Sequence, residues 1–212
     1  MSIAKIRAAL ESRLLTVKGT ATGFTTTNAG YALNTKVINL ANVGTGIIYA
    51  GDIIKFNGDT NPYIVSVGGQ ANGSITLASG LLRAIPTSAT AITVQSFDTV
   101  IENWDYTPVT GIPYQRYFLE AFSDEPIGSD IETRFRGMFY VRLLYPQKTG
   151  TKQIQDRAQM IKNAFNLKTS LTKDNLTVYV DKQPDFKIEG NDGDRFCGIV
   201  EIRFITNLIQ DI

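Results

Sequence analysis

Apolar residues at helical spacing appear in two stretches of the chain. In the first, Ser2 is a candidate N-cap, and the apolar positions that follow it recur at steps of three or four: Ile3, Ile6, Leu10 and Leu14. The second begins after a candidate cap at Thr151, and its apolar stripe consists of Ile154, Ala158, Ile161 and Phe165. The charged residues Lys152, Asp156, Arg157 and Lys162 lie largely off this stripe. Both stretches are therefore predicted to be amphipathic helices.

Alternation of side chains between two faces predicts four strands in the second half of the chain. They are Tyr114–Phe122, Met138–Tyr145, Leu176–Val180 and Val200–Phe204. The Asp192-Gly193 pair fits a tight turn that joins Phe186–Glu189 to the last of these strands. The economical arrangement of these elements is an α+β fold, with one mixed or antiparallel sheet and two helices packed on one face.

The other face of this predicted sheet carries side chains that are large for a solvated surface. They are Phe118, Phe122, Tyr140, Leu144, Tyr179, Ile199 and Ile205. An exposed apolar patch usually marks a surface for a partner, and the alternative is that another part of the chain covers it. The pattern leaves both possibilities open.

The composition changes abruptly in the middle of the chain. Residues 17–98 contain 7 charged residues among 82, hold 11 of the 18 glycines and are rich in Thr, Ala and Asn. Short β-branched runs punctuated by glycine pairs predict strands at Thr35–Leu40, Gly46–Tyr49, Asp52–Phe56, Tyr63–Val67, Ser74–Ala78 and Ala91–Gln95. We therefore expect 17–98 to be an inserted all-β domain, a small barrel or sandwich, within a discontinuous α+β domain of residues 1–16 and 99–212.

Residue types that carry common chemistry are scarce. The chain has no histidine, which removes the commonest general base and most zinc sites, and no phosphate-binding loop occurs. The one cysteine, Cys197, lies in a predicted strand and is expected to fill space. A net charge of +1 does not indicate a duplex DNA-binding surface, and no apolar run reaches the ~18 residues of a membrane span. We expect no enzyme, no catalytic or metal site and no cofactor.

Acidic residues crowd the connection between the first two strands of the second half: Asp124, Glu125, Asp130 and Glu132. A carboxylate pair could support acid–base chemistry, but no apolar pocket or third group is apparent that would set the two pKa values apart. Solvated loop charges, or charges that face Arg134 or Arg136 of a partner copy, are the favoured interpretation.

The two flanks together resemble the tail terminator (tail completion) proteins of long-tailed bacteriophages and prophages. The resemblance rests on the first helix and on these segments: Trp104-Asp-Tyr-Thr-Pro108, Pro113-Tyr-Gln-Arg116, Arg136-Gly137 with Tyr145-Pro146, Leu176–Val180 and Gly198–Phe204. It covers about 130 residues. Residues 17–98 depart from the family pattern, since compact members of the family have only a short connection after the first helix.

This resemblance implies a virion structural protein, made in the host cytoplasm, at the head-proximal end of the phage tail. Such proteins form a homo-oligomeric ring, usually of six subunits, that caps the tail tube, stops its polymerisation and offers a surface to the head-side connector protein. DNA would meet the ring only by passing through its lumen.

A head-to-tail ring needs two different complementary surfaces on one subunit. We expect the acidic Ser123–Glu132 loop, together with Arg134, Arg136 and Arg142, to contribute to the subunit or tube interface. Two alternatives remain open: a head–tail connector or neck protein, and an accessory protein that binds a glycan or receptor through the inserted domain.

Overall fold

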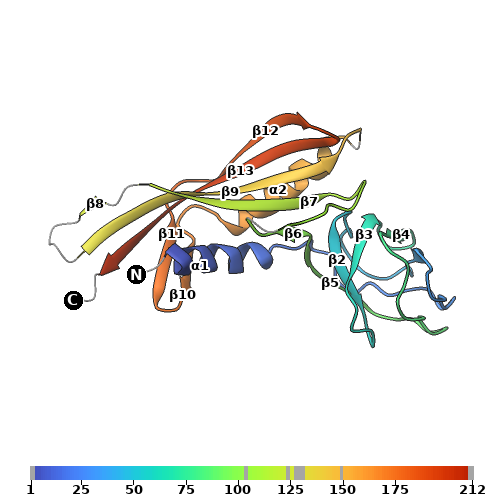
Figure 1. Ribbon diagram of the computed structural model, residues 1–212. Coiled ribbons are helices and arrows are strands. Elements are labelled where there is room, and N and C mark those ends of the chain that lie inside the picture. Colours follow the sequence, from blue (N-terminus) through green and yellow to red (C-terminus); the bar gives the residue numbers. More distant parts are fainter. Residues whose placement is uncertain (1–2, 103–104, 123–124, 127–131, 149, 210–212) are drawn as a thin grey trace. The chain divides into compact units, whose positions relative to one another are not determined.

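The computed structural model describes residues 3–102, 105–122, 125–126, 132–148 and 150–209. The protein is mostly β, with 45% of its residues in strands and 14% in helices, and the strands form two sheets (Figure 1). The chain divides into two compact units. The larger unit consists of Met1–Val17, Thr99–Trp104 and Gln115–Ile212, and the smaller of Lys18–Asp98 and Asp105–Tyr114.

The larger unit is built around an eight-stranded sheet. Its elements are α1 (Ile3–Leu15), β6 (Thr99–Val100), β7 (Tyr114–Ala121), β8 (Glu125–Pro126), β9 (Glu132–Pro146), α2 (Lys152–Ala164), β10 (Ser170–Lys173), β11 (Leu176–Val180), β12 (Asp185–Asp192) and β13 (Arg195–Ile209). The strand order is β10-β11-β13-β9-β7-β6, with β12 also paired to β13 and β8 to β9. The β6–β7 pairing is parallel, whereas β13 is antiparallel to β9, β11 and β12.

Two strands of 15 residues each, β9 and β13, form the centre of this sheet. They pair along their whole length, from Arg195 opposite Pro146 to Ile209 opposite Glu132. The alternation in the sequence predicted only the later part of β9, Met138–Tyr145, and the middle of β13, Val200–Phe204. Gly137, Gly198 and Thr206 occupy positions where the apolar alternation would otherwise continue, and the pattern therefore stops before the strands do.

The prediction of an α+β fold with two helices packed on one face of a single sheet is wrong. The structure contains two sheets and is dominated by strands, and the two described helices have only 13 residues each. The prediction failed because it counted elements from regular patterns. Short strands such as β6 and β8, and the irregular ends of β9 and β13, leave no such pattern, so the strand content was underestimated.

The two helices begin and end close to the predicted residues, but their faces differ from the prediction. In α1, Ile6, Ala9, Leu10 and Leu14 are buried, whereas Ile3 is half exposed. In α2, the buried residues are Ile154, Arg157, Ala158 and Ile161. Thr151 is the N-cap residue of α2, yet its side chain makes no capping hydrogen bond.

Gly137 explains part of the Arg-Gly pattern in the sequence. It lies on β9 directly opposite Phe204 of β13. A Cβ atom at this position would lie 2.5 Å from the ring of Phe204 and 2.6 Å from the backbone oxygen of Glu120. Glycine is therefore required for the close approach of Phe204 and the neighbouring chain to β9.

The smaller unit contains a separate five-stranded sheet in the order β1-β4-β3-β2-β5. Its strands are β1 (Val37–Asn39), β2 (Asp52–Phe56), β3 (Tyr63–Val67), β4 (Ser74–Leu77) and β5 (Ile92–Phe97). The segment Phe24–Thr27 bonds to both edges of this sheet: Ile92 N donates to Phe24 O at 2.9 Å, and Thr27 N donates to Asn39 O at 3.0 Å. This segment therefore bridges the two edge strands and closes the sheet on itself.

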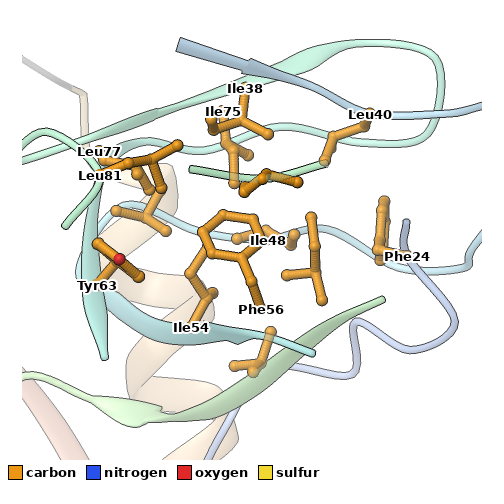
Figure 2. Close-up of a cluster of buried hydrophobic side chains, with 14 of the residues drawn as sticks. Phe24, Ile38, Leu40, Ile48, Ile54, Phe56, Tyr63, Ile75, Leu77 and Leu81 are labelled. Atoms are coloured by element: carbon orange, nitrogen blue, oxygen red, sulfur yellow. The ribbon is translucent and has the colours of Figure 1, made fainter. Parts of the chain in front are cut away.

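The interior of the smaller unit is a single apolar cluster (Figure 2). Within this cluster, the rings of Phe56 and Tyr63 pack edge to face, with their centroids 5.5 Å apart. The Tyr63 hydroxyl donates to Asp59 at 2.6 Å and accepts from the backbone N–H of Leu82 at 3.1 Å, so its polar end is satisfied. The smaller unit thus has a core of its own. The interpretation of residues 17–98 as a domain inserted between residues 1–16 and 99–212 stays a prediction.

Candidate functional site

The three arginines predicted for an interface lie on one strand, β9, and each is separated from the next by an even number of positions. Arg134, Arg136 and Arg142 therefore project from the same face of the sheet. Eight positions separate the first from the last, which corresponds to about 26 Å along a strand at ~3.3 Å per residue. They occupy two separate places on the sheet rather than one cluster.

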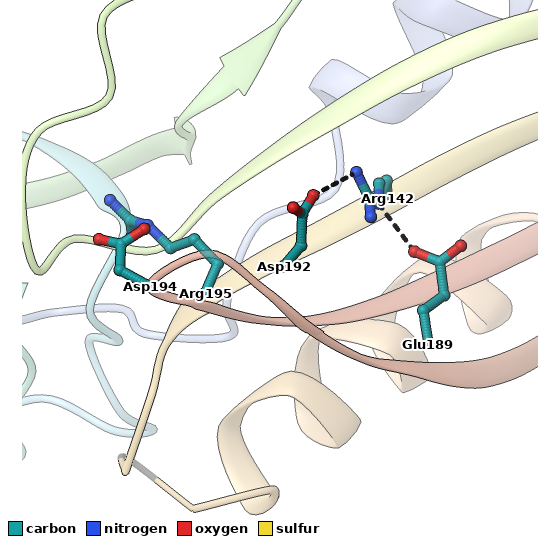
Figure 3. A network of polar contacts seen from close by, with 5 residues as sticks. All are labelled: Arg142, Glu189, Asp192, Asp194 and Arg195. Carbon is teal, nitrogen blue, oxygen red and sulfur yellow. Dashed lines mark hydrogen bonds and ion pairs between the residues drawn. The ribbon is translucent and has the colours of Figure 1, made fainter.

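Arg142 is held by carboxylates of its own chain (Figure 3). Its guanidinium Nε lies 2.7 Å from Glu189 Oε2, and Nη1 lies 3.1 Å from Asp192 Oδ2. Both carboxylates belong to β12, which is separated from β9 by β13. Burial alone would lower the pKa of Arg142, but the bound carboxylates outweigh it and raise the pKa above its ordinary value. This side chain fastens β12 to the sheet from within one subunit.

Arg134 and Arg136 lie near the other end of β9, where the acidic connection returns to the sheet. The backbone of Glu125 in β8 is opposite Arg134, and Glu132 is the first residue of β9. Arg134 Nε also lies 3.5 Å from Asn207 Oδ1 on β13. Asp124 and Asp130 fall outside the described residues, as do the side chains of Glu125 and Glu132. Along the sequence, the acidic connection is thus next to Arg134 and Arg136 and further from Arg142.

The sheet face predicted to be apolar is a mixed surface. Leu144 and Ile199 are buried, whereas Phe122 and Tyr179 are 42% and 47% exposed. Phe118 stacks on Tyr140 with ring centroids 4.7 Å apart.

Polar contacts join the strands across this face. Tyr140 donates from its hydroxyl to Glu120 Oε2 at 2.9 Å, and burial, followed by this bond, raises the pKa of Tyr140 to about 12. Lys187 binds Glu201 at 2.7 Å, and Arg203 binds Asp181 at 3.1 Å. The face therefore combines a few aromatic rings with charges that pair across the strands.

The surface charge of the smaller unit differs from its composition. All three acidic residues of 18–98 are buried inside it: Asp52, Asp59 and Asp98 have 2%, 7% and 8% exposure. Each accepts a hydrogen bond within the unit, from Tyr49 N, from Tyr63 and from Tyr106 respectively. The four basic residues are exposed or half-buried: Lys18, Lys36, Lys55 and Arg83. The charge that this segment presents to solvent is consequently positive.

A buried polar group that the sequence patterns missed lies inside the larger unit. Arg157 was expected off the apolar stripe of its helix, yet it is 3% exposed. Its guanidinium donates from Nε and Nη2 to Gln115 Oε1, both at 3.0 Å, and from Nη1 to Val17 O at 3.0 Å. A signal was present, because residues 154, 157, 158 and 161 follow the spacing of a buried helix face.

Metal binding and thiol reactivity can each be judged from the part of the chain that the structure describes. Within it, no three His, Cys, Asp or Glu side chains are placed to hold a metal ion. Cys197 is fully buried in β13, and burial raises the pKa of its thiol, which disfavours the reactive thiolate. Among the described residues, neither helix has the length and apolarity needed to cross a bilayer.

Comparison with known proteins identifies the class of this chain. The family model described as "Phage tail terminator protein" matches residues 80–204, and no curated protein matches the chain. One solved structure shares 18% sequence identity, covers 55% of this chain and 82% of its own, and superposes with a TM-score of 0.41, a likeness too small to carry an argument. Because the family model spans more than half of the chain, the protein belongs to the phage tail terminator proteins, which are structural components of the phage tail.

Proposed function

We propose that this protein caps the head-proximal end of the tail tube as a ring of identical copies, usually six, without enzymatic activity. The capped end stops tube polymerisation and offers a surface to the head-side connector. The family match over residues 80–204 is the observation that carries this proposal. The match includes β7, β9, α2 and most of β13 in the larger unit, and also β5 in the smaller unit, which supports placing most of the tail function in the larger unit.

The arrangement of charges on β9 supports a head-to-tail contact between copies. Arg142 is already bound by two carboxylates of its own subunit. Arg134 and Arg136 follow, in the sequence, a connection that contains Asp124, Glu125, Asp130 and Glu132. A strongly acidic segment and a pair of arginines at one end of the sheet provide opposite charges for neighbouring copies of a ring. We therefore place the subunit contact at this end of β9, and assign Arg142 to the fold of the subunit.

The experiment reverses the charge of these two arginines. In the Arg134→Glu/Arg136→Glu variant, rings on purified tail tubes should disappear in negative-stain images, and tubes assembled with the variant should grow to uncontrolled lengths. The matched control is Lys36→Glu/Lys55→Glu, which changes the net charge equally within the smaller unit and should leave the rings intact. Rings that persist in the first variant would contradict the proposed contact.

The location of the protein on the virion separates tail capping from a role in the neck. Immunogold labelling, or a tag at the N-terminus, should mark one end of free tails that have not joined heads. Label that is found only on filled heads would favour a head–tail connector instead.

A second role is favoured by one observation, the burial of all three acids of 18–98 beneath a surface that keeps its four basic residues. A weakly basic surface rich in Thr and Asn suits binding of an anionic glycan on the host. Host cells should then adsorb the full-length protein, and adsorption should fall in the Lys36→Glu/Lys55→Glu variant. Equal adsorption of both proteins would remove this second role.

A further inference from the structure

The chain passes between its two units four times. The crossings follow Val17, Asp98, Trp104 and Tyr114, so the larger unit is assembled from three separate pieces of chain. Each break is a place where the larger unit could open. A discontinuous unit of this kind needs interactions that tie the ends of its pieces together, because the sequence connection between them runs through a different core.

One end of each of the three pieces takes part in a buried hydrogen-bond network around Arg157. Val17 is the last residue of the first piece, Thr99 is the first of the second, and Gln115 is the first of the third. Arg157 Nη1 donates to Val17 O at 3.0 Å, and its Nε and Nη2 donate to Gln115 Oε1. Gln115 Nε2 in turn donates to Thr99 Oγ1 at 2.8 Å.

The geometry of the network suits this task. A guanidinium has five N–H donors in a rigid plane, and it can therefore address two acceptors in fixed directions at once. Gln115 carries both an acceptor and donors on one amide, which allows it to relay the contact from Arg157 to Thr99. Arg157 and Gln115 are 3% and 0% exposed, so water does not compete for these bonds.

Backbone pairing also brings two of these three ends together. Thr99 and Val100 form β6, which pairs in parallel with Gln115 and Arg116 at the start of β7. The start of the second piece and the start of the third are therefore neighbours in the sheet, and the side chain of Arg157 adds the end of the first piece to them. Helix α2 supplies the arginine from the middle of the third piece.

We propose that Arg157 and Gln115 form a clasp that closes the larger unit at the points where the chain leaves for the smaller unit and returns. The clasp fixes the three ends independently of what residues 18–98 contain. The larger unit can then keep its sheet intact while the smaller unit unfolds locally or diverges in sequence. This inference concerns the architecture and does not depend on the proposed ring.

Hydrogen exchange on the full-length protein tests the clasp. Arg157→Met keeps an unbranched apolar stem that can pack in the same place but removes the guanidinium and its donors. Amide exchange should accelerate about tenfold or more at Val17, at Thr99–Val100 and at Gln115–Arg116, because buried hydrogen bonds to a charged group are lost. Exchange in β10 and β11 should not change. The matched control, Arg203→Met, removes an exposed arginine and should leave all three ends as they are.

A simple packing role for Arg157 predicts a different result. In that case Arg157→Met accelerates exchange along α2 and the strands beside it, and spares Val17 and Thr99. This outcome would overturn the clasp.

Two milder variants keep the test decisive should Arg157→Met fail to fold. Gln115→Glu retains an acceptor for Arg157 but loses the donor to Thr99, and Thr99→Val removes the accepting hydroxyl. Both should accelerate exchange at Thr99–Val100 while Val17 stays protected. Equal acceleration at Val17, or no acceleration at Thr99, would contradict the relay through Gln115.

Discussion

The two units handle their charged residues in opposite ways. The larger unit has charged pairs on the surface of its sheet, such as Lys187 with Glu201 and Arg203 with Asp181, although Arg157 and Arg195 are buried. In the smaller unit, the three acids of 18–98 are buried and bonded to backbone and tyrosine groups, whereas Asp105 is exposed. Exposed pairs contribute little stability and can exchange partners readily, whereas a buried bonded carboxylate is costly to disturb. The larger unit therefore has charges available for contacts with other proteins, and the smaller unit uses its acids to hold its own turns.

The largest expected effect comes from truncating one buried aromatic side chain, in one core at a time. Phe56→Ala in the smaller unit and Phe139→Ala in the larger each remove a fully buried ring, which typically costs about 3–5 kcal/mol. If the two cores are separate, each variant should lower the protection of only its own unit. Hydrogen exchange at Ile54 and Val65 reports on the smaller unit, and exchange at Val141 and Val200 on the larger. Loss of protection in both units from either variant would show that the cores act as one.

A smaller effect is expected at the turn that precedes β2. Gly51 has a φ of +88°, and a Cβ there would lie 2.5 Å from the ring of Phe97 and 2.8 Å from Pro113 O. Gly51→Ala should lower the free energy of unfolding of the smaller unit by about 1–3 kcal/mol, from strain and overpacking together. Gly58→Ala is the matched control, because Gly58 has a φ of +81° and a Cβ added there would meet no atom within 4 Å. Urea unfolding should show the larger loss for Gly51→Ala, and equal losses would mean that backbone strain alone explains both.

The smallest expected effect is on the pH dependence of the smaller unit. Burial raises the pKa of Asp98 above the ordinary value of 3.8, and the hydrogen bond from Tyr106 only partly offsets this. The folded state therefore binds a proton that the unfolded state has released, and the stabilisation is complete below pH 3.8 and is lost as the pH rises through the folded pKa. Asp98→Asn should remove this decline.

Asp59 provides the opposite case within the same unit. Burial would raise its pKa, but hydrogen bonds from Tyr63 and Asn61 outweigh burial and lower the pKa below 3.8. Its contribution to stability is present above pH 3.8 and is lost as the pH falls through the folded pKa. Melting temperatures of Asp98→Asn and Asp59→Asn should therefore approach that of the parent protein toward pH 2.5 and diverge from it toward pH 6 in opposite directions, with Asp98→Asn above the parent and Asp59→Asn below it. Parallel curves would show that neither carboxyl is perturbed.

Regular patterns in the sequence predicted the elements that obey them and missed those that do not. The bounds of β2 and β3 agree with the alternation of Asp52–Phe56 and Tyr63–Val67. The Asp192-Gly193 turn is also confirmed, since Asp192 pairs with Arg195 across a two-residue connection and Gly193 has a φ of +59°. The full lengths of β9 and β13 could not be predicted, because glycine and threonine at core-facing positions interrupt the pattern.

The candidate interface was predictable only as a list of charges. The sequence shows that arginines and acids are close to one another along the chain, but pairing depends on which strands become neighbours. Arg142 illustrates the difficulty, because its partners Glu189 and Asp192 are about 50 positions away and reach it through the order of β9, β13 and β12. Arg157 shows the complementary error. A charged residue was assigned to the outside of a helix by its type, although its position belonged to the inside.

The complete burial of the single thiol at position 197 has a practical consequence for mapping neighbours in an assembled tail. A maleimide dye or cysteine-directed crosslinker added to the natural protein should find no accessible target. One cysteine introduced at Arg134 and another at Glu132, in separate preparations, would each give a uniquely labelled particle. When the two preparations are mixed in one assembly, a disulfide between a cysteine at position 134 and one at position 132 would show that these positions of adjacent copies lie in contact.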